Sequence, residues 1–252
     1  MNLLRVPLVV LVLALLAQWL AAQIGNFFRE KMGILEEAQQ SDFSIVEAAI
    51  LTLLALIIGF SFSMAVSRYD QRKNYEEAEA NAIGTEYVRA GLLPSPDATR
   101  VRESLKAYLE QRILFYQTRD AAQLAEIDAT TARLQSDLWS TVEASAAAHP
   151  TPVVALAVGG MNDVLNSQGY TQAAWWNRIP VAAWFFMTAI AIFCNLLIGY
   201  GAHRKNWVLL CILPLAISTS FFLIADIDSP RSGLIRVVPQ NLSALSQSLH
   251  PR

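Results

Sequence analysis

Charged residues are scarce in this chain. Asp, Glu, Lys and Arg make up 16% of its 252 residues, while apolar residues make up 54%. Ordinary soluble domains contain about 25% charged residues. A chain this poor in charge carries more apolar surface than a soluble core can bury, so we expect a membrane protein.

Cysteine and histidine are rare as well. Cys194 and Cys211 both fall in apolar stretches, where we expect small packing side chains and neither a disulfide nor a metal pair. The three histidines are scattered, and the sequence has no nucleotide loop, nucleophile elbow or HExxH motif. We therefore predict no enzyme and no resident cofactor. The formal net charge of −2 argues against nucleic-acid binding.

Four apolar runs are long enough to cross a bilayer. They cover residues 3–22, 43–66, 179–200 and 207–225. The first run could instead be a signal peptide, but it is longer than a usual signal core, and Trp19-Leu20-Ala21 makes a poor cleavage site. We interpret it as a retained helix, which gives an all-α protein with four spans.

Basic residues near the span ends predict the orientation. An arrangement with both termini in the cytoplasm places seven basic residues inside and four outside, which is the favoured bias. The inside set is Arg5, Arg68, Arg72, Lys73, Arg178, Arg231 and Arg236, and the outside set is Arg29, Lys31, Arg204 and Lys205.

Most of the charge lies between the second and third spans. Residues 67–177 hold 24 of the 40 charged residues, and their composition favours helix. Pro94 should break the second helix, Asp97 should cap the next, and residues 166–169 should form a turn. We expect spans one and two in 1–66, a cytoplasmic helical extension continuous with helix 2 in 67–177, spans three and four in 178–226, and a cytoplasmic tail in 227–252.

Two rows of residues run along the second span. Ala55, Gly59 and Ser63 are small and spaced by four, so they would let a neighbouring backbone approach closely. Thr52, Leu56 and Phe60 form a second row with one residue per turn. Spacing alone leaves three surroundings open for this second row: lipid, another helix of a bundle, or a shared central axis.

Two charged groups lie at span ends. Arg68, Arg72 and Lys73 come after the second span, where they either anchor it at the cytoplasmic face or form a ring of charge around a vestibule. Asp226 and Asp228 end the fourth span, and acidic residues there need a partner. Pairing with Arg68 or Arg72 is one possibility and a cation is the other, although two carboxylates are few for calcium.

The second span and the polar helix after it resemble a known family. Gly59-Phe60, then Arg68-Tyr69, then a polar helix resemble the second membrane helix of bestrophins, where a similar stretch lines the neck of a pentameric anion channel. The longer string RYDQRKNYEEAEANAIGTEYVRAGLLP is similar to that of the bacterial bestrophin-like domain family. In animal bestrophins the acidic segment after the fourth span helps to hold calcium, and this chain departs from that pattern.

The resemblance implies a function. It implies an oligomeric ion channel in a bacterial inner membrane, a homo-oligomer and by resemblance a pentamer, conducting anions through a hydrophobic neck. Thr52, Leu56 and Phe60 would line the neck, and Thr52 would make its ring wetter than a bulky apolar residue would. The alternative is a non-conducting membrane scaffold or sensor whose cytoplasmic helices bind a protein partner. Oligomeric mass distinguishes the two, because a channel of this kind needs several copies.

Overall fold

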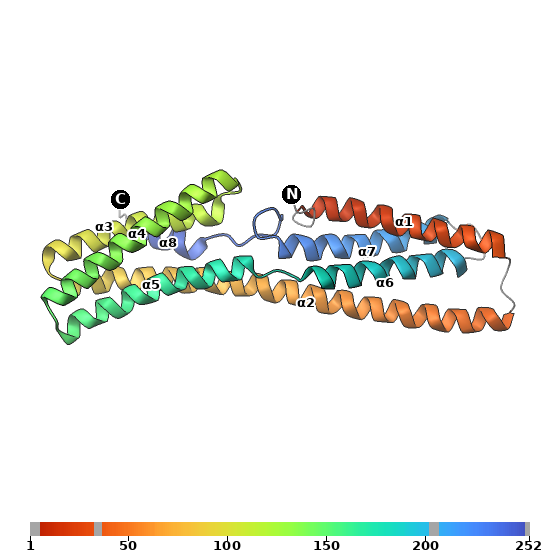
Figure 1. Cartoon of the computed structure of the whole chain (residues 1–252), viewed down its shortest axis with the longest axis horizontal. Helices are drawn as coiled ribbons and strands as arrows, with labels where there is room; N and C mark the ends of the chain where they lie inside the picture. The colour runs from red at the N-terminus through yellow and green to blue at the C-terminus, as the bar shows by residue number, and fades with distance from the viewer. Residues whose placement is uncertain (1–5, 33–36, 202–206, 250–252) are drawn as a thin grey trace. The chain divides into compact units, whose positions relative to one another are not determined.

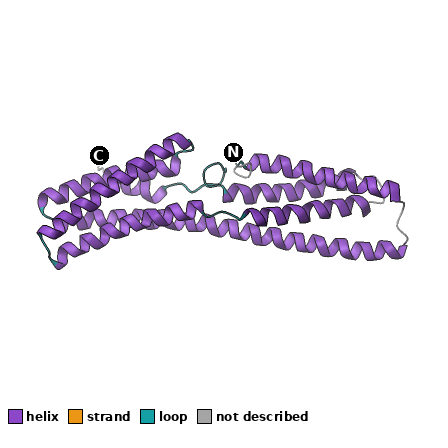
Figure 2. Ribbon diagram, viewed as in Figure 1, coloured by secondary structure: helices purple, strands orange, loops and turns teal. Residues whose placement is uncertain are grey.

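The computed structural model describes residues 6–32, 37–201 and 207–249, which contain helices and loops but no strand (Figure 2). The predicted all-α membrane fold is confirmed. The helices are α1 (Pro7–Met32), α2 (Glu37–Arg89), α3 (Ser95–Gln117), α4 (Ala121–Ala148), α5 (Pro152–Trp176), α6 (Val181–Gly201), α7 (Trp207–Asp228) and α8 (Gln240–Leu249), with a 3-10 turn η2 (Ala90–Leu92) after α2.

Four stretches of the described residues are long and apolar enough to cross a membrane. They are Pro7–Lys31, Gln39–Leu92, Pro152–Gly201 and Cys211–Asp228. The third stretch contains both α5 and α6, and its apolar run is that of α6. Each predicted span falls within one of these stretches apart from a few terminal residues: residue 6 and residues 207–210 lie outside the stretches, and residues 3–5 lie outside the described part of the chain.

The chain divides into two compact units. Unit 1 combines residues 1–68 with 178–236, and unit 2 combines residues 69–177 with 237–252. The helix α2 contributes its first part to unit 1 and its second part to unit 2. The predicted division into membrane and cytoplasmic segments concerns a bilayer and stays a prediction.

In unit 1, α1 lies beside α6 and α7 (Figure 1). The close approach of α1 and α6 depends on two glycines. A Cβ added at Gly25 would collide with the carbonyl oxygen of Leu196, and one added at Gly199 would collide with that of Ala22. Reciprocal glycines of this kind let two helix backbones touch, which is a common way for helices to pack inside a membrane.

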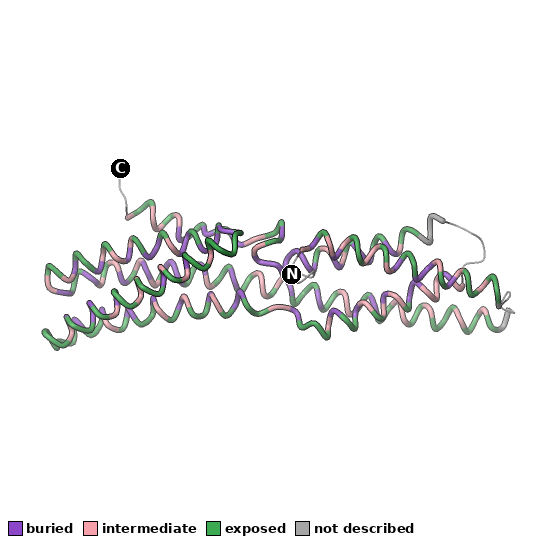
Figure 3. Tube along the Cα trace, turned by 45° about the horizontal axis from the view of Figure 1, so that its top comes forward, coloured by how far each residue is buried: buried purple, intermediate pink, exposed green. Residues whose placement is uncertain are grey.

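Unit 2 is a helical bundle built from α3, α4, α5, α8 and the second part of α2. Buried residues recur along its helices with exposed residues between them (Figure 3), as the helical period requires. Its aromatic centre is formed by Phe115, Tyr116 and Trp175, whose ring centroids lie 4.9–5.5 Å apart. Asp120 accepts from the backbone N–H groups of Ala122 and Gln123 and so caps α4.

Two local predictions for unit 2 are wrong. Asp97 lies in the first turn of α3, and the residue at the N-cap is Pro94, which offers no side-chain cap. Residues 166–169 continue the helix α5 instead of turning. The Ser167 hydroxyl donates to the carbonyl of Val164, and Gly169 is exposed, so both residues fit a helix whose neighbouring positions are buried.

Candidate functional site

The first part of α2 has one side packed by its own chain. Leu54, Ser61 and Ala65 are buried, and their spacing of seven and four places them on a single face. Thr52, Leu56 and Phe60 lie on the opposite face and are exposed, Leu56 at 53% and Phe60 at 62%. The row predicted from the sequence therefore forms a continuous surface, which the described part of the chain leaves uncovered.

Thr52 is less polar on this surface than its side chain suggests. Its hydroxyl donates to the backbone carbonyl of Ala48, with 2.8 Å between the oxygens. A threonine that returns its hydrogen bond to the preceding turn satisfies its donor within the helix. Thr52 therefore exposes its methyl group and a hydroxyl oxygen that can still accept a hydrogen bond.

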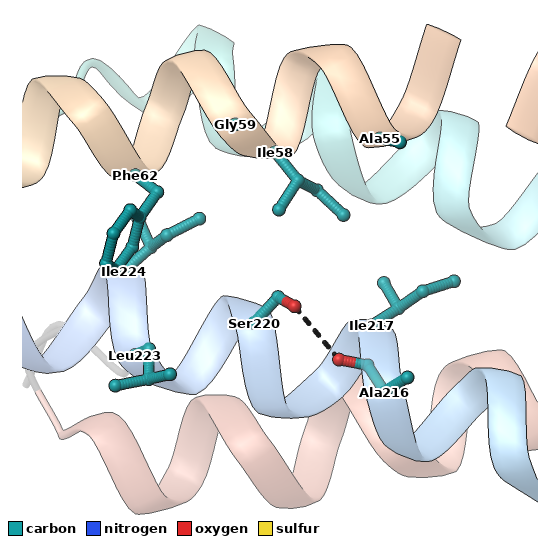
Figure 4. Close-up of a pocket in the computed structure, with 9 residues that line it drawn as sticks. All are labelled: Ala55, Ile58, Gly59, Phe62, Ala216, Ile217, Ser220, Leu223 and Ile224. Atoms are coloured by element: carbon teal, nitrogen blue, oxygen red, sulfur yellow. Dashed lines mark hydrogen bonds between the residues drawn. The ribbon is translucent and has the colours of Figure 1, made fainter. Parts of the chain in front are cut away.

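The small-residue row also lies outside the packing of the chain. Ala55, Gly59 and Ser63 are exposed, and a Cβ added at Gly59 would meet no atom of the described residues within 4 Å. Ala55 and Gly59 border a groove of about 390 Å³ between α2 and α7 (Figure 4). The groove is apolar, and its Ser220 hydroxyl donates to the carbonyl of Ala216. Within the chain, close backbone contacts of this kind occur at Gly25 and Gly199, and the close packing predicted for the small-residue row stays a prediction.

The basic residues after the second span differ in surroundings. Lys73 is exposed. Arg72 is buried at 1% exposure, where its Nε and Nη2 donate to the carbonyls of Ala174 and Asn177 at the end of α5. A guanidinium at a helix C-terminus satisfies orphan carbonyls and complements the helix dipole. Arg68 is partly buried, with its Nη1 4.0 Å from Asp228 Oδ1.

The two acidic residues after the fourth span bind backbone groups. Asp226 accepts from the N–H groups of Leu234 and Ile235 at 2.7 and 2.8 Å, which folds the segment after α7 back on itself. Asp228 accepts from the N–H of Ile179 at 3.0 and 3.3 Å. These carboxylates face N–H donors and the Arg68 guanidinium. Such surroundings do not suit a cation, which needs its oxygen ligands free.

No metal cluster is formed elsewhere in the part of the chain that the structure describes. Within those residues, no group of three or more His, Cys, Asp or Glu side chains lies close enough to hold a metal ion. The expected absence of a resident metal stays a prediction. The hydrogen bonds of Asp226 and Asp228 indicate that both carboxylates hold backbone segments in place.

Sequence analysis missed a polar cluster inside unit 1. Gln18, Asn195 and Ser218 are buried; Gln18 Nε2 donates to Ser218 Oγ at 3.3 Å, and Asn195 Nδ2 donates to Gln18 Oε1 at 3.2 Å. The cluster therefore connects α1, α6 and α7. An amide within an apolar span was the available signal, since such residues are costly unless they find partners between helices.

Unit 2 contains a line of buried charged residues that was not predicted from the sequence. Steps of four and three along α2 and into η2 bring six buried residues to one face: Arg72, Glu76, Glu79, Ile83, Glu86 and Ala90. Glu79 pairs with Arg112 and accepts from the hydroxyls of Tyr116 and Thr171. Glu76 accepts from Asn241 Nδ2 and from the N–H of Leu242, which binds the start of α8.

Comparisons with known proteins agree with this architecture. The chain resembles crystal structures of a bacterial bestrophin homologue from Klebsiella pneumoniae. One variant has a TM-score of 0.65 at 16% identity over 95% of this chain and 93% of that one. Another structure, phased with zinc, has a TM-score of 0.62 at 17% identity over 95% and 94%. These identities establish the fold alone.

A comparison with curated proteins gives no match. The model of the bestrophin-like domain matches residues 9–242, which is nearly the whole described chain. This agrees with the four membrane-spanning stretches and with the resemblance carried by the end of the second span. The chain belongs to the bestrophin-like domain family.

Proposed function

We propose that this chain is the subunit of an oligomeric, anion-conducting channel whose hydrophobic neck is lined by α2. The observation that carries the proposal is the free row Thr52, Leu56 and Phe60, opposite the face that the chain buries itself. Several copies arranged around one axis would turn this row into successive rings. Membership of the bestrophin-like domain family supports that arrangement. The resemblance of the second span to the neck helix of bestrophins implies a pentameric anion channel.

The chemistry of the row suggests how the neck would work. Rings of Leu56 and Phe60 form a constriction that opens and closes to ions by wetting and dewetting. Below it, the exposed Lys73 lies at the inner mouth, and Arg68 and Arg72 add to the positive field from more buried positions. The exposed Glu77 opposes this field, so the proposed preference for anions depends on the balance of these charges.

We place the channel in a bacterial inner membrane with both termini in the cytoplasm. Segments 1–66 and 178–226 then hold the spans, and segments 67–177 and 227–252 face the cytoplasm. Impermeant thiol labelling of intact cells tests this topology. Lys31→Cys should react from outside, whereas Arg119→Cys should react only after the membrane is opened. Labelling of both from the same side would contradict the topology.

The double variant Leu56→Ala with Phe60→Ala tests the neck. Shortening both rings widens the constriction, so purified protein in planar bilayers should show higher conductance with assembly unchanged. Leu16→Ala with Leu20→Ala, on the exposed face of α1, is the matched control and should leave conductance unaltered. The neck assignment is lost if the double variant of α2 falls apart or conducts like the wild type.

Oligomeric mass in detergent separates this function from the alternative of a membrane scaffold or sensor. A stable oligomer is expected for the channel. A monomer that passes no ions at any pH, voltage or calcium concentration would favour a scaffold whose cytoplasmic helices bind a protein partner.

A further inference from the structure

Glu86 is the last carboxylate in the buried line along α2. It is fully buried, and among the residues that the structure describes neither of its carboxylate oxygens has a hydrogen-bond partner. The other glutamates of the line, Glu76 and Glu79, are both satisfied by donors. A buried ionised carboxylate without a donor is strongly unfavourable, so Glu86 requires a different explanation.

Close packing against α5 keeps Glu86 in this position. A Cβ added at Gly160 would collide with Glu86 Oε2 and would lie 2.9 Å from Arg89 Nη1. The glycine of α5 therefore provides the space that the Glu86 carboxyl occupies. The close contact between α2 and α5 at this point therefore requires the Glu86 carboxyl to stay in the space beside Gly160.

Few charges face this carboxyl. On α2 there is Arg89, and α5 contains a single acidic or basic residue, Asp163. On α3 the cations Arg102 and Lys106 lie over the ring of Tyr87. Burial raises the pKa of Glu86 to about 8, while Arg89 lowers it and Asp163 raises it. Glu86 lies twenty residues beyond Val66, about 30 Å along the helix, outside the predicted membrane span.

We propose that Glu86 and Gly160 form a proton-controlled joint between α2 and α5, closed while the Glu86 carboxyl is protonated and loosened when its proton is lost. The neutral carboxyl can stay between the two helices, whereas the carboxylate needs water or a cation and opens the contact to reach one. The proposal concerns packing within one chain and does not depend on ion conduction.

The direction of the pH effect is set by the two pKa values. The closed joint holds the proton up to about pH 8, and an opened, hydrated carboxyl loses it near the ordinary value of 4.5. Closure is therefore most favourable at low pH and weakens as pH rises through this window. The opening equilibrium should increase by up to about tenfold per pH unit between these values and level off above pH 8.

Hydrogen exchange of the full-length protein in detergent measures the opening directly. After correction for the intrinsic pH dependence of exchange, protection of the α5 amides around Gly160 should be lower at pH 8 than at pH 6, by up to about a hundredfold. Glu86→Gln cannot lose a proton and should abolish this difference. Glu77→Gln, an exposed acid on the same helix, is the matched control and should keep the wild-type response.

Infrared titration provides a second readout that does not need the Gln variant to fold. The wild type should show the carbonyl band of a protonated carboxyl that disappears with a midpoint near pH 8. Asp163→Asn removes the nearby like charge and should lower that midpoint. The joint is refuted by α5 protection that is equal at pH 6 and pH 8, by a wild-type pH response in Glu86→Gln, or by a band that does not titrate between pH 5 and 9.

Discussion

At the residue scale, Arg112 shows what a buried charge demands. Its side chain is fully buried in unit 2, with its Nε bound to the Glu79 carboxylate and its guanidinium carbon 4.4 Å from the centre of the Phe115 ring. Glu79 in turn satisfies Tyr116 and Thr171. Burial and the Glu79 charge raise the pKa of Tyr116, so its hydroxyl stays a donor to this carboxylate.

Glu79→Gln should therefore be strongly destabilising. It leaves the Arg112 charge buried without a counter-charge, which costs about 3–5 kcal/mol. Thermal unfolding in detergent should show a large fall in the midpoint. Glu77→Gln, exposed two residues earlier, should change stability by less than about 0.5 kcal/mol. Equal unfolding midpoints for the two variants would show that the pair does not support the bundle.

Asp226 gives a second prediction at this scale. Because its carboxylate accepts from two backbone N–H groups, the segment after α7 should be held without a divalent cation. Adding calcium or a chelator should leave the unfolding midpoint unchanged. Asp226→Asn keeps one carbonyl acceptor and should lower stability by about 1–3 kcal/mol. A clear stabilisation by calcium in the wild type that Asp226→Asn abolishes would mean that the carboxylate binds the cation instead.

Single residues were also where sequence reasoning was weakest. The steps of four and three that carry Arg72, Glu76, Glu79 and Glu86 are visible in the sequence, but charged side chains at those positions are typical of a solvated face. Their partners come from distant segments, such as Arg112 in α3 and Leu242 in α8. Such pairings depend on tertiary packing, so the local sequence pattern of α2 does not predict them.

At the element scale, strong local signals were reliable. An apolar run begins at residue 43 and is followed by residues that favour helix. This pattern predicted one helix that leaves the membrane and continues into water, and α2 is a single helix of 53 residues. Pro94 ends that stretch as expected. The turn predicted at residues 166–169 failed because a helix tolerates a glycine at a cost of about 1 kcal/mol when its other face is buried.

The packing of α1 against α6 can be tested by adding one methyl group. Gly199→Ala should disrupt the contact, because the new Cβ collides with the carbonyl of Ala22. Gly59→Ala is the matched control on another membrane helix, since a Cβ there meets no atom of the described residues within 4 Å. Unfolding in detergent should therefore be much easier for Gly199→Ala than for Gly59→Ala. Equal stability of the two variants would show that the α1 and α6 backbones are not in contact.

At the scale of the whole molecule, the uncovered surface of unit 1 is the feature that one chain does not explain. Both rows on the second span, the small residues and Thr52, Leu56 and Phe60, are exposed. The sequence predicts the two rows but does not show whether they face lipid, a bundle partner or a shared axis. All three surroundings favour the same spacing of apolar residues. The structure of one chain leaves both rows exposed, so its described helices are not the bundle partner. An experiment on assembled copies of the chain is needed to distinguish lipid from a shared axis.

Cross-linking of single cysteines can decide between lipid and a shared axis. In a background with Cys194→Ala and Cys211→Ser, Leu56→Cys should form disulfide-linked dimers on oxidation, because residues close to an axis approach their counterparts in other copies. Leu16→Cys in α1 is exposed to a similar degree, 51% against 53%, and should remain monomeric if that face meets lipid. Residues on the outer surface of an oligomer are too far from their counterparts to bridge. If Leu16→Cys cross-links and Leu56→Cys does not, α1 would lie at the interface, and the neck would have to be built from another helix.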